Sequence, residues 1–293
     1  MSGIYWLASY PKSGNTWLRV FLANLQQAQD YAAVPADINA LETGEIASSR
    51  GWLDELLGFD SADLRPDEIE KLRPTVYRWT AQQERTQVGY HKIHDAFTYL
   101  PGGEPMISLS ATLGALYIIR NPLDVAISAS HHWGCTLERA IANLAQDNFT
   151  LAQSRRGLSS QVAQRLLNWS QHVLSWADAP GLACCVIRYE DMLDEALPTF
   201  TRATEFLGLP ADQAAIGQAI AHSDFEVLSA QEQAQGFKER SHKASRFFRS
   251  GRAGGWQDIL SSSQVEQIVS VHGAVMARFG YLDQQGSPYL NKE

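Results

Sequence analysis

A turn near the start of the chain gathers residue types that bind anions. Residues 10–17 read Tyr-Pro-Lys-Ser-Gly-Asn-Thr-Trp and follow a short apolar run at 4–9. A helical pattern begins inside this segment, so unpaired backbone N–H groups and the positive end of the helix dipole face the turn. Gly14 permits close backbone approach, Lys12 adds a charge, and the side-chain donors are Ser13, Asn15 and Thr16. The turn is expected to hold a phosphate-like anion; the alternative is an ordinary strand-to-helix turn with a solvated lysine.

The spacing of this turn differs from that of a Walker A loop. A Walker A loop has four residues between a first glycine and Gly-Lys-Ser/Thr, whereas Lys12 precedes Gly14 by two positions. A kinase also needs Mg²⁺ to neutralise its triphosphate, and the apolar run at 114–119 leads into Arg120 rather than into an aspartate. The pattern favours an anion site without a metal, and a P-loop kinase of small molecules is kept as the alternative enzyme.

A second candidate group lies in the segment 89–94, which reads Gly-Tyr-His-Lys-Ile-His. Lys92 and His94 are two residues apart in an expected strand, so they share one face. Histidine can take a proton and lysine can stabilise developing negative charge, which are the parts that a group transfer needs. His91 is the competing base on the opposite face, while His131 and His132 are interpreted as pocket or surface residues.

These residues need an α/β framework to position them. Apolar runs predict strands at 4–9, 86–93, 114–119 and 182–188. Helical patterns are expected at 14–27, from Pro122 to about Trp176, and at 193–207, 211–222 and 262–279, with irregular structure and short helices at 28–84 and a loop at 235–255. Alternating strands and helices predict a P-loop-like, three-layer α/β/α fold with a mainly parallel sheet, in one domain over residues 1–293. Ligands in such folds bind at the carboxyl ends of the strands.

Composition excludes several other classes of protein. The formal net charge is −8, which argues against a nucleic-acid partner. Three cysteines, two of them adjacent, do not form a disulfide framework. No run approaches the roughly 20 apolar residues that span a bilayer, and the N-terminus lacks the pattern of a signal peptide. A cytoplasmic protein without a transmembrane segment is expected.

Three segments together resemble the nucleotide-binding signatures of sulfotransferases that use 3′-phosphoadenosine-5′-phosphosulfate (PAPS), of the cytosolic and bacterial type. Residues 10–17 resemble the 5′-phosphosulfate signature of that family. Residues 117–128, Tyr-Ile-Ile-Arg-Asn-Pro-Leu-Asp-Val-Ala-Ile-Ser, are similar to its 3′-phosphate signature. Residues 248–256, within the loop 236–256, are similar to its C-terminal nucleotide loop. The segments have the family's order and spacing, and the resemblance runs from about residue 4 to residue 279.

The resemblance implies transfer of a sulfuryl group from PAPS, without a metal, to a hydroxyl or amine of a small-molecule, sugar or lipid acceptor, with PAP as the product. It implies that His94 is the general base and that Lys92 helps to stabilise the transition state. Lys12 would stabilise the bridging oxygen, and Ser128 would restrain Lys12 until the acceptor binds. A non-catalytic protein that binds PAPS or PAP is the alternative of another class.

The resemblance also assigns the nucleotide contacts. Residues 12–16 would hold the 5′-phosphosulfate, Trp17 would stack on the adenine, and Tyr189 would contact the base. The 3′-phosphate would be held by Arg120 and Ser128 and covered by Arg249 and Gly251. The alternative for Arg120 is a surface ion pair with Asp124, four residues later. The remaining implied nucleotide-binding residues are Ser223, Phe225, Phe247, Phe248 and Ser250. The basic residues between 238 and 252 predict a mobile lid that orders over the phosphates; the alternative is a solvated run of charges.

The sequence departs from the family pattern at three places. Ser250 stands where the family often has a lysine, and Arg252 or Arg246 would compensate for the missing charge. Asp95-Ala96 replaces Leu-Pro after the candidate base, which is expected to alter the rim of the acceptor pocket. The animal-type dimer element is not matched at 257–262, so the oligomeric state stays open. Aromatic residues within 31–87 and 136–160 would suit several acceptors, or would simply be core.

Overall fold

The computed structural model describes residues 3–28, 34–41, 44–83, 88–153 and 159–288. The chain forms two compact units. Unit 1 comprises Met1–Tyr10, Gly44–Tyr117 and Gln146–Val186, and unit 2 comprises Pro11–Thr43, Ile118–Ala145 and Ile187–Glu293. The regions 31–87 and 136–160, whose aromatic residues would suit an acceptor, lie partly outside the described residues, and Tyr31 is among the residues not described. Each unit is described by itself.

A parallel sheet of four strands forms the centre of the fold, in the order β2-β1-β3-β6. Its strands are β1 (Gly3–Ser9), β2 (Val88–Ile93), β3 (Thr112–Ile119) and β6 (Cys184–Arg188). β1 and β2 run parallel, with Gly3 opposite Val88 and Ala8 opposite Ile93. The strands predicted from the apolar runs are confirmed to within two residues at their described ends, and residues 86–87 of the second prediction lie outside the described part. Burial of nearly every residue of β1 and β3 explains why their sequences do not alternate.

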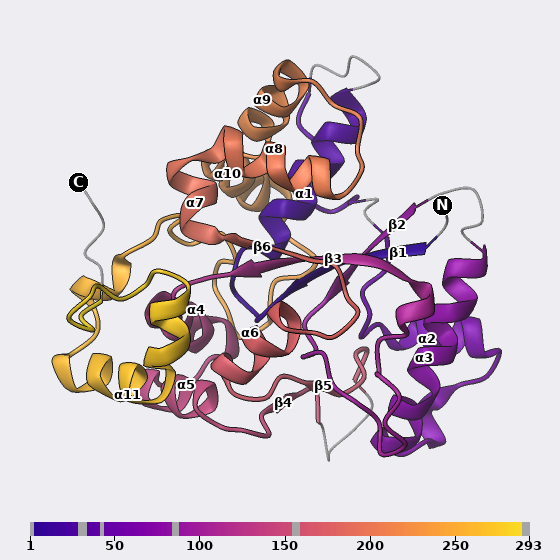
Figure 1. The fold of residues 1–293 in the computed structure, drawn as a ribbon. Coiled ribbons are helices and arrows are strands. Elements are labelled where there is room, and N and C mark those ends of the chain that lie inside the picture. Colours follow the sequence, from indigo (N-terminus) through magenta and orange to yellow (C-terminus); the bar gives the residue numbers. More distant parts are fainter. Residues whose placement is uncertain (1–2, 29–33, 42–43, 84–87, 154–158, 289–293) are drawn as a thin grey trace. The chain divides into compact units, whose positions relative to one another are not determined.

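Unit 1 adds helices and a small second sheet. They are α2 (Arg50–Leu57), α3 (Pro66–Gln83), α6 (Trp169–Ala177), two short 3₁₀ turns (Ser61–Asp63 and Leu109–Ala111), β4 (Thr150–Leu151) and β5 (Gln164–Arg165). α2 lies beside α3 (Figure 1). α3 contacts β1, where Trp6 packs edge-on against Tyr77 with ring centroids 4.8 Å apart.

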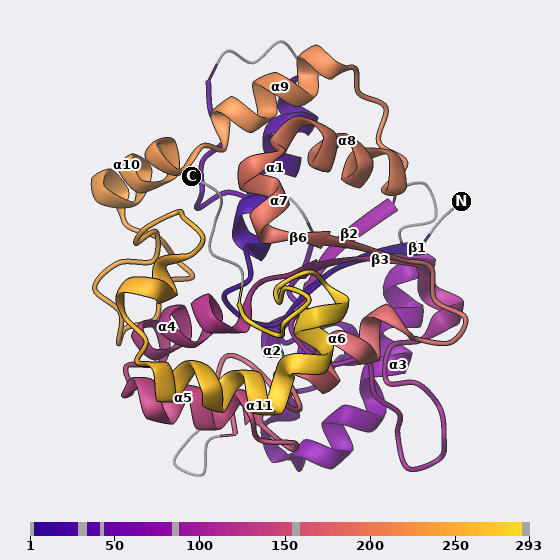
Figure 2. The same cartoon turned by 60° about the vertical axis from the view of Figure 1, so that its left-hand side comes forward.

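Unit 2 is mainly helical. Its helices are α1 (Asn15–Ala28), α4 (Pro122–Trp133), α5 (Leu137–Leu144), α7 (Tyr189–Asp194), α8 (Ala196–Phe206), α9 (Gln213–His222), α10 (Phe225–Gln235), a 3₁₀ turn (Gly255–Asp258) and α11 (Ser262–Arg278). α9 contacts both α1 and α8, and α11 runs along α5 (Figures 1 and 2). The helices predicted at 14–27, 211–222 and 262–279 are confirmed to within two residues.

One sequence prediction of helix is wrong in part. The helical pattern expected from Pro122 to about Trp176 ends first at Trp133, because Gly134 adopts a left-handed conformation (φ 61°) that caps α4. α5 follows, but β4 and β5 then pair antiparallel where helix was expected. Irregular structure with short helices was expected at 28–84, but α3 in this region is 18 residues long and contains Pro74.

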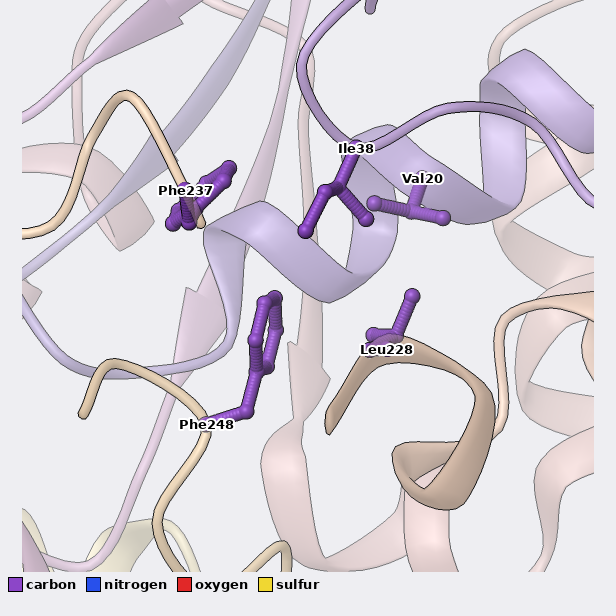
Figure 3. Packing of buried hydrophobic residues seen from close by; sticks show 5 residues of the cluster. All are labelled: Val20, Ile38, Leu228, Phe237 and Phe248. Carbon is purple, nitrogen blue, oxygen red and sulfur yellow. The ribbon is translucent and has the colours of Figure 1, made fainter. Parts of the chain in front are cut away.

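A cluster of buried apolar side chains in unit 2 fixes the C-terminal loop. Val20 of α1, Ile38, and Leu228 of α10 pack with two loop residues, Phe237 and Phe248 (Figure 3). Burying a phenylalanine side chain contributes roughly 1.5–3 kcal/mol. The loop 236–256 therefore has an apolar anchor on α1, in the helix that begins at the predicted anion turn.

The α/β class with a central parallel sheet flanked by helices is confirmed. Among the described residues, no helix combines the length and apolar character that crossing a membrane requires.

Candidate functional site

The turn between β1 and α1 has a left-handed backbone at two residues. Lys12 has φ 72° and Gly14 has φ 105°. A lysine in this region costs of order 1–3 kcal/mol, and such strain concentrates at functional sites. A Cβ on Gly14 would lie 2.7 Å from Cδ2 of Tyr189, so glycine is required there for two reasons. The turn thus keeps a shape that an ordinary strand-to-helix connection does not need.

Three buried donors at this turn have no hydrogen-bond partner in the part of the chain that the structure describes. They are Ser13 Oγ, Trp17 Nε1 and Arg120 Nε. Leaving a buried polar group without a partner costs roughly 1–3 kcal/mol. Buried donors of this kind fit a polar ligand that accepts hydrogen bonds.

Arg120 joins three of the predicted segments inside unit 2. Its Nη1 donates to the carbonyl oxygen of Lys12 at 3.0 Å, and its Nη2 donates to that of Arg252 at 3.2 Å. The guanidinium carbon lies 4.2 Å from the ring centroid of Tyr189. Residues 108 positions apart in the sequence are therefore held together by one side chain.

Positive charge gathers around Arg120. Burial, followed by the charges of Arg120 and Arg252, lowers the pKa of Arg249, and Asp124 opposes this shift. The cluster of Arg120, Arg249 and Arg252 suits a phosphate group, which can neutralise several guanidinium charges. Arg252 is close enough to Arg249 for its charge to act there, and it lies two residues after Ser250, which replaces the family lysine.

Asp124 accepts two backbone N–H groups at the end of the C-terminal loop. Its Oδ2 accepts the N–H of Gly254 at 2.8 Å and its Oδ1 accepts that of Trp256 at 3.1 Å. Burial raises the pKa of Asp124, while the Arg120 charge and these hydrogen bonds lower it. The carboxylate fixes the end of the C-terminal loop beside the arginine cluster.

The other half of the loop is held by Glu232 and by a tight contact at Gly251. Glu232 accepts the N–H groups of Phe247 at 2.8 Å and Phe248 at 2.9 Å. Gly251 has φ 59°, and a Cβ there would lie 2.3 Å from the ring of Phe225. The predicted lid is thus tied at several points, and its mobility stays a prediction.

Lys12 points its ammonium at an aromatic ring. Its Nζ lies 3.9 Å from the ring centroid of Phe247, within the range of a cation–π interaction. Phe247 also meets the ring of His132 edge-on at 6.2 Å. Ser128 is half-buried on α4, and its predicted restraint of Lys12 stays a prediction.

Trp17 and Tyr189, the residues assigned to the base of the nucleotide, belong to one aromatic group. Trp17 packs edge-on against Tyr189 at 5.8 Å and Phe200 at 5.5 Å. Ser223 is fully buried, and its hydroxyl donates to the carbonyl oxygen of Ala219 at 2.8 Å. Ser223 therefore caps α9 with its hydroxyl, so a role toward a nucleotide is expected from its position rather than from a donated hydrogen bond.

Unit 1 carries the candidate base. His94 follows the last residue of β2, and its Nδ1 lies 2.8 Å from the carbonyl oxygen of Ser9. Because a carbonyl oxygen can only accept, the neutral ring carries its hydrogen on Nδ1 and its lone pair on Nε2. A lone pair on Nε2 is what a general base requires. Lys92 lies in β2 and is 9% exposed.

The rival histidines have other surroundings. His91 is 1% exposed; its Nδ1 accepts the N–H of Glu45 at 3.1 Å, and its ring stacks on Trp52 at 5.3 Å. Burial and then the charge of Arg249 lower the pKa of His131 in unit 2. The geometry of His91 is that of a core residue.

Three carboxylates that hold the segments of the candidate site were not predicted from the sequence. Asp124 was interpreted only as a partner of Arg120, and Glu232 and Glu190 received no role. Glu190 accepts the N–H of Asn121 at 3.0 Å and the hydroxyl of Tyr281 at 2.9 Å. Each carboxylate accepts from residues distant in the sequence, so no local spacing could have revealed it.

Fold and candidate site together define an α/β protein with a left-handed turn after its first strand and a cluster of arginines around Arg120, which contacts that turn. The chain belongs to the sulfotransferase domain family, whose model matches residues 4–280. This assignment confirms the family suggested by the three segments and the predicted class of enzyme, a sulfotransferase. The described residues contain no group of three or more His, Cys, Asp or Glu side chains arranged to hold a metal ion.

Named relatives agree with the family. Sulfotransferase 2A6 of Rattus norvegicus is 24% identical over 284 residues, which cover 93% of this chain and 84% of the relative. Flavonol 3-sulfotransferase of Flaveria bidentis is 24% identical over 276 residues, covering 89% and 78%.

Solved structures show the same fold. Mouse sulfotransferase SULT7A1, complexed with PAP, has a TM-score of 0.56 at 19% identity and covers 97% of this chain and 86% of its own. Retinol dehydratase, in complex with androsterone and the inactive cofactor PAP, has a TM-score of 0.60 at 18% identity and covers 93% and 80%.

Proposed function

We propose that the chain transfers a sulfuryl group from PAPS to a hydroxyl or amine of a small-molecule acceptor and leaves PAP as the product. The observation that carries the proposal is the bond from Arg120 to the carbonyl of Lys12, which joins the two phosphate segments of unit 2. The family match does not favour the two alternatives, a P-loop kinase and a non-catalytic nucleotide-binding protein.

The residues of unit 2 fit such a donor. Ser13 Oγ, Trp17 Nε1 and Arg120 Nε are buried donors without a partner among the described residues. Lys12 and the backbone of residues 13–16 would hold the 5′-phosphosulfate, and the arginine cluster would hold the 3′-phosphate. Trp17 and Tyr189 would bind the adenine. No metal is invoked, because lysine and arginine supply the positive charge.

Unit 1 would supply the acid–base chemistry. Nε2 of His94 takes the proton of the acceptor hydroxyl while the acceptor oxygen bonds to sulfur and the bond from sulfur to the phosphate oxygen breaks. The electron pair of that bond leaves with the phosphate oxygen of PAP, where Lys12 would stabilise it, with Lys92 assisting. Ser9, whose carbonyl fixes the tautomer of His94, precedes Lys12 by three positions in the chain.

A small-molecule acceptor is proposed on the strength of the relatives. Retinol dehydratase has been solved with androsterone and with retinol, and a plant relative is named for sulfation of a flavonol. One domain over residues 1–293 is proposed because a single family model spans 4–280. A cytoplasmic location stays a proposal, and no oligomeric state is assigned.

Replacement of His94 by alanine tests the assignment of the base. His94→Ala removes the proton acceptor but none of the nucleotide contacts, so we expect turnover with labelled PAPS to fall at least roughly a hundredfold, within the usual range for general bases. PAP affinity, measured by calorimetry, should stay within twofold of that of the unchanged protein.

His131→Ala is the matched comparison, because His131 is an exposed histidine of α4 that was interpreted as a pocket or surface residue. It should retain turnover within a fewfold. Near-normal turnover of His94→Ala, or a larger loss in His131→Ala, would remove His94 from the proposed mechanism.

A further inference from the structure

The residue that follows the candidate base is buried in an ion pair. Asp95 is 1% exposed, and its two carboxylate oxygens accept from Nη1 and Nη2 of Arg73 at 2.9 and 2.7 Å. Arg73, on α3, is 2% exposed and also donates through Nε to the hydroxyl of Tyr77 at 2.8 Å. Asp95 was expected to alter the rim of an acceptor pocket, but its side chain is enclosed by protein.

Buried ion pairs of this kind are weak sources of stability, since desolvation of both charges offsets their attraction. Their usual value lies in the geometry that they fix, because two-pronged pairing between a guanidinium and a carboxylate has a defined orientation. What the pair fixes here is the main chain of residues 94–96.

Further hydrogen bonds hold the same short segment. Nε1 of Trp176 donates to the carbonyl oxygen of Asp95 at 2.9 Å. Nε2 of His172 lies 2.9 Å from the carbonyl oxygen of His94, so this nitrogen carries the hydrogen. The backbone N–H of Ala96 donates to the carbonyl oxygen of Arg165 at 2.8 Å.

His172 is fixed in turn by a hydroxyl. Because Nε2 of His172 donates, its Nδ1 accepts, and the partner is the hydroxyl of Tyr117 at 2.8 Å. His172 is fully buried on α6, and burial lowers its pKa to about 4, so the neutral ring needed for this arrangement is the stable form.

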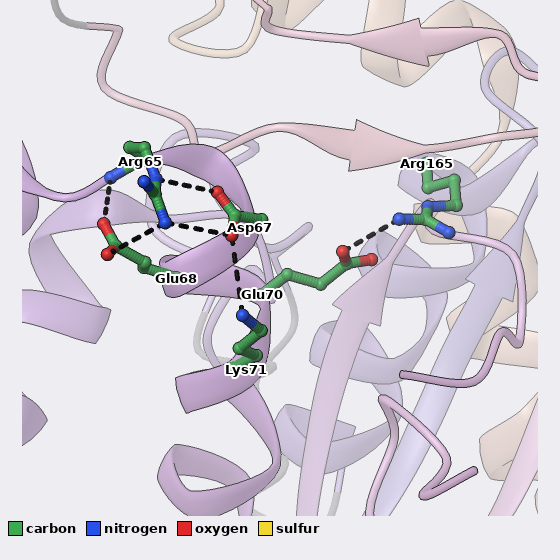
Figure 4. Close-up of polar contacts among 6 residues, drawn as sticks. All are labelled: Arg65, Asp67, Glu68, Glu70, Lys71 and Arg165. Carbon is green, nitrogen blue, oxygen red and sulfur yellow. Dashed lines mark hydrogen bonds and ion pairs between the residues drawn. The ribbon is translucent and has the colours of Figure 1, made fainter. Parts of the chain in front are cut away.

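The ion pair also joins α3 to the small second sheet. Asp95 Oδ1 accepts the backbone N–H of Arg165 in β5 at 3.0 Å. The side chain of Arg165 pairs with Glu70 of α3 at 2.8 Å, as Figure 4 shows. Residues 94–96 are therefore held by hydrogen bonds and an ion pair to α3, β5 and α6 in unit 1.

We propose that Asp95, locked by Arg73, is a positioning residue that holds His94 where its Nδ1 meets the Ser9 carbonyl and its Nε2 keeps the lone pair. The expected effect of Asp95 on turnover rests on the proposed function. The claim that Asp95 fixes the position and tautomer of His94 does not, because it concerns contacts within unit 1 alone. Loss of the pair should free the main chain at residue 94 and with it the fixed tautomer of the ring.

The direct test is nitrogen-15 NMR of the His94 ring, assigned by comparison with His94→Ala. The unchanged protein should show a single neutral tautomer with hydrogen on Nδ1. Asp95→Asn, which keeps the side-chain shape but removes the charge, should show averaged ring shifts from mixed tautomers. An unaltered Nδ1–H tautomer in folded Asp95→Asn would overturn the proposal.

Turnover measured with and without His94 is a second test, because it separates an effect through His94 from a general structural effect of Asp95. Asp95→Asn should lower kcat roughly ten- to a hundredfold, the loss that a misplaced catalytic group causes, with PAP affinity unchanged. In a His94→Ala background the same substitution should cause no further loss, because Asp95 acts through His94. Equal losses in both backgrounds would refute a positioning role.

Arg78→Gln is the matched control, because it breaks an exposed ion pair, to Glu104 at 2.8 Å, on the same helix. It should leave the His94 tautomer, kcat and PAP affinity unchanged.

Tyr117→Phe is the second variant, should Asp95→Asn fail to fold. It removes only the hydroxyl that fixes His172, and it should give mixed His94 tautomers and a lower kcat, both to a smaller degree. No change in either would overturn the proposal. If His94→Ala itself keeps full turnover, the proposed base fails, while the NMR result still decides the geometric claim.

Discussion

Two glycines set the shape of the nucleotide side at the residue scale. A Cβ on Gly14 would meet Tyr189, and a Cβ on Gly251 would meet Phe225. Both glycines also have a positive φ. They were identified from their place in motifs, but the ring that each one faces comes from a distant segment and could not be predicted.

Gly251→Ala should therefore weaken PAP binding. The added methyl group would force apart the loop and the ring of Phe225, and the left-handed backbone adds strain of order 1–3 kcal/mol. We expect the dissociation constant of PAP, measured by calorimetry, to rise roughly tenfold or more, since about 1.4 kcal/mol corresponds to a factor of ten.

Gly208→Ala is the control for this change. Gly208 has φ 67°, but nothing lies within 4 Å of an added Cβ. It should cost stability without changing PAP affinity. Equal weakening of PAP binding in both variants, or in neither, would show that the contact with Phe225 does not control the loop.

From the sequence, the turn residues and Arg120 were expected to belong to one site. Arg120 contacts the carbonyl oxygen of Lys12 within unit 2, while the binding roles of these residues stay predictions. The roles of Asp124 and Glu232 were not predicted, because a carboxylate that accepts backbone N–H groups leaves no spacing pattern. Their roles follow only from contacts across more than a dozen residues.

Secondary structure was predictable where hydrophobic burial decides it. β1 and β3 are buried along most of their length, so their apolar runs mark them clearly. β4 and β5 have two residues each, too few for a periodic signal. Pro74 lies inside α3, where proline normally argues against a helix.

α6 contributes a pH-dependent element to stability. Burial lowers the pKa of His172 from 6.5 to about 4. A depressed histidine pKa means that the unfolded chain binds the proton more tightly. The stabilising contribution is thus complete above pH 6.5 and is lost as pH falls toward 4.

His172→Gln, which keeps a donor for the His94 carbonyl, should reduce this loss. Between pH 7 and pH 5, the free energy of unfolding should fall by roughly 2 kcal/mol less than in the unchanged protein. Burial also lowers the pKa of His272 to about 4, so part of the slope should persist. Urea titrations at both pH values measure the difference.

Exposed His242→Gln is the comparison for that experiment. It should retain the full loss between pH 7 and pH 5. If His172→Gln shows the same slope as His242→Gln, the buried neutral histidine does not govern acid stability in this range.

At the scale of the whole molecule, the order of strands and helices was sufficient to predict an α/β fold with a parallel sheet. The family assignment rests on a match over residues 4–280, and the solved relatives share the fold at 18–19% identity. The acceptor was not predictable, since aromatic residues serve a pocket and a core equally well.

The central claim is sulfuryl transfer from PAPS, and the most direct measurement follows the sulfur. The chain is incubated with ³⁵S-labelled PAPS, a library of small hydroxyl and amine compounds, and EDTA. We expect label to move to at least one compound without added metal, and the transfer to fall at least roughly a hundredfold in His94→Ala. PAP binding without transfer to any compound, or transfer of phosphate that strictly requires Mg²⁺ and ATP, would contradict it.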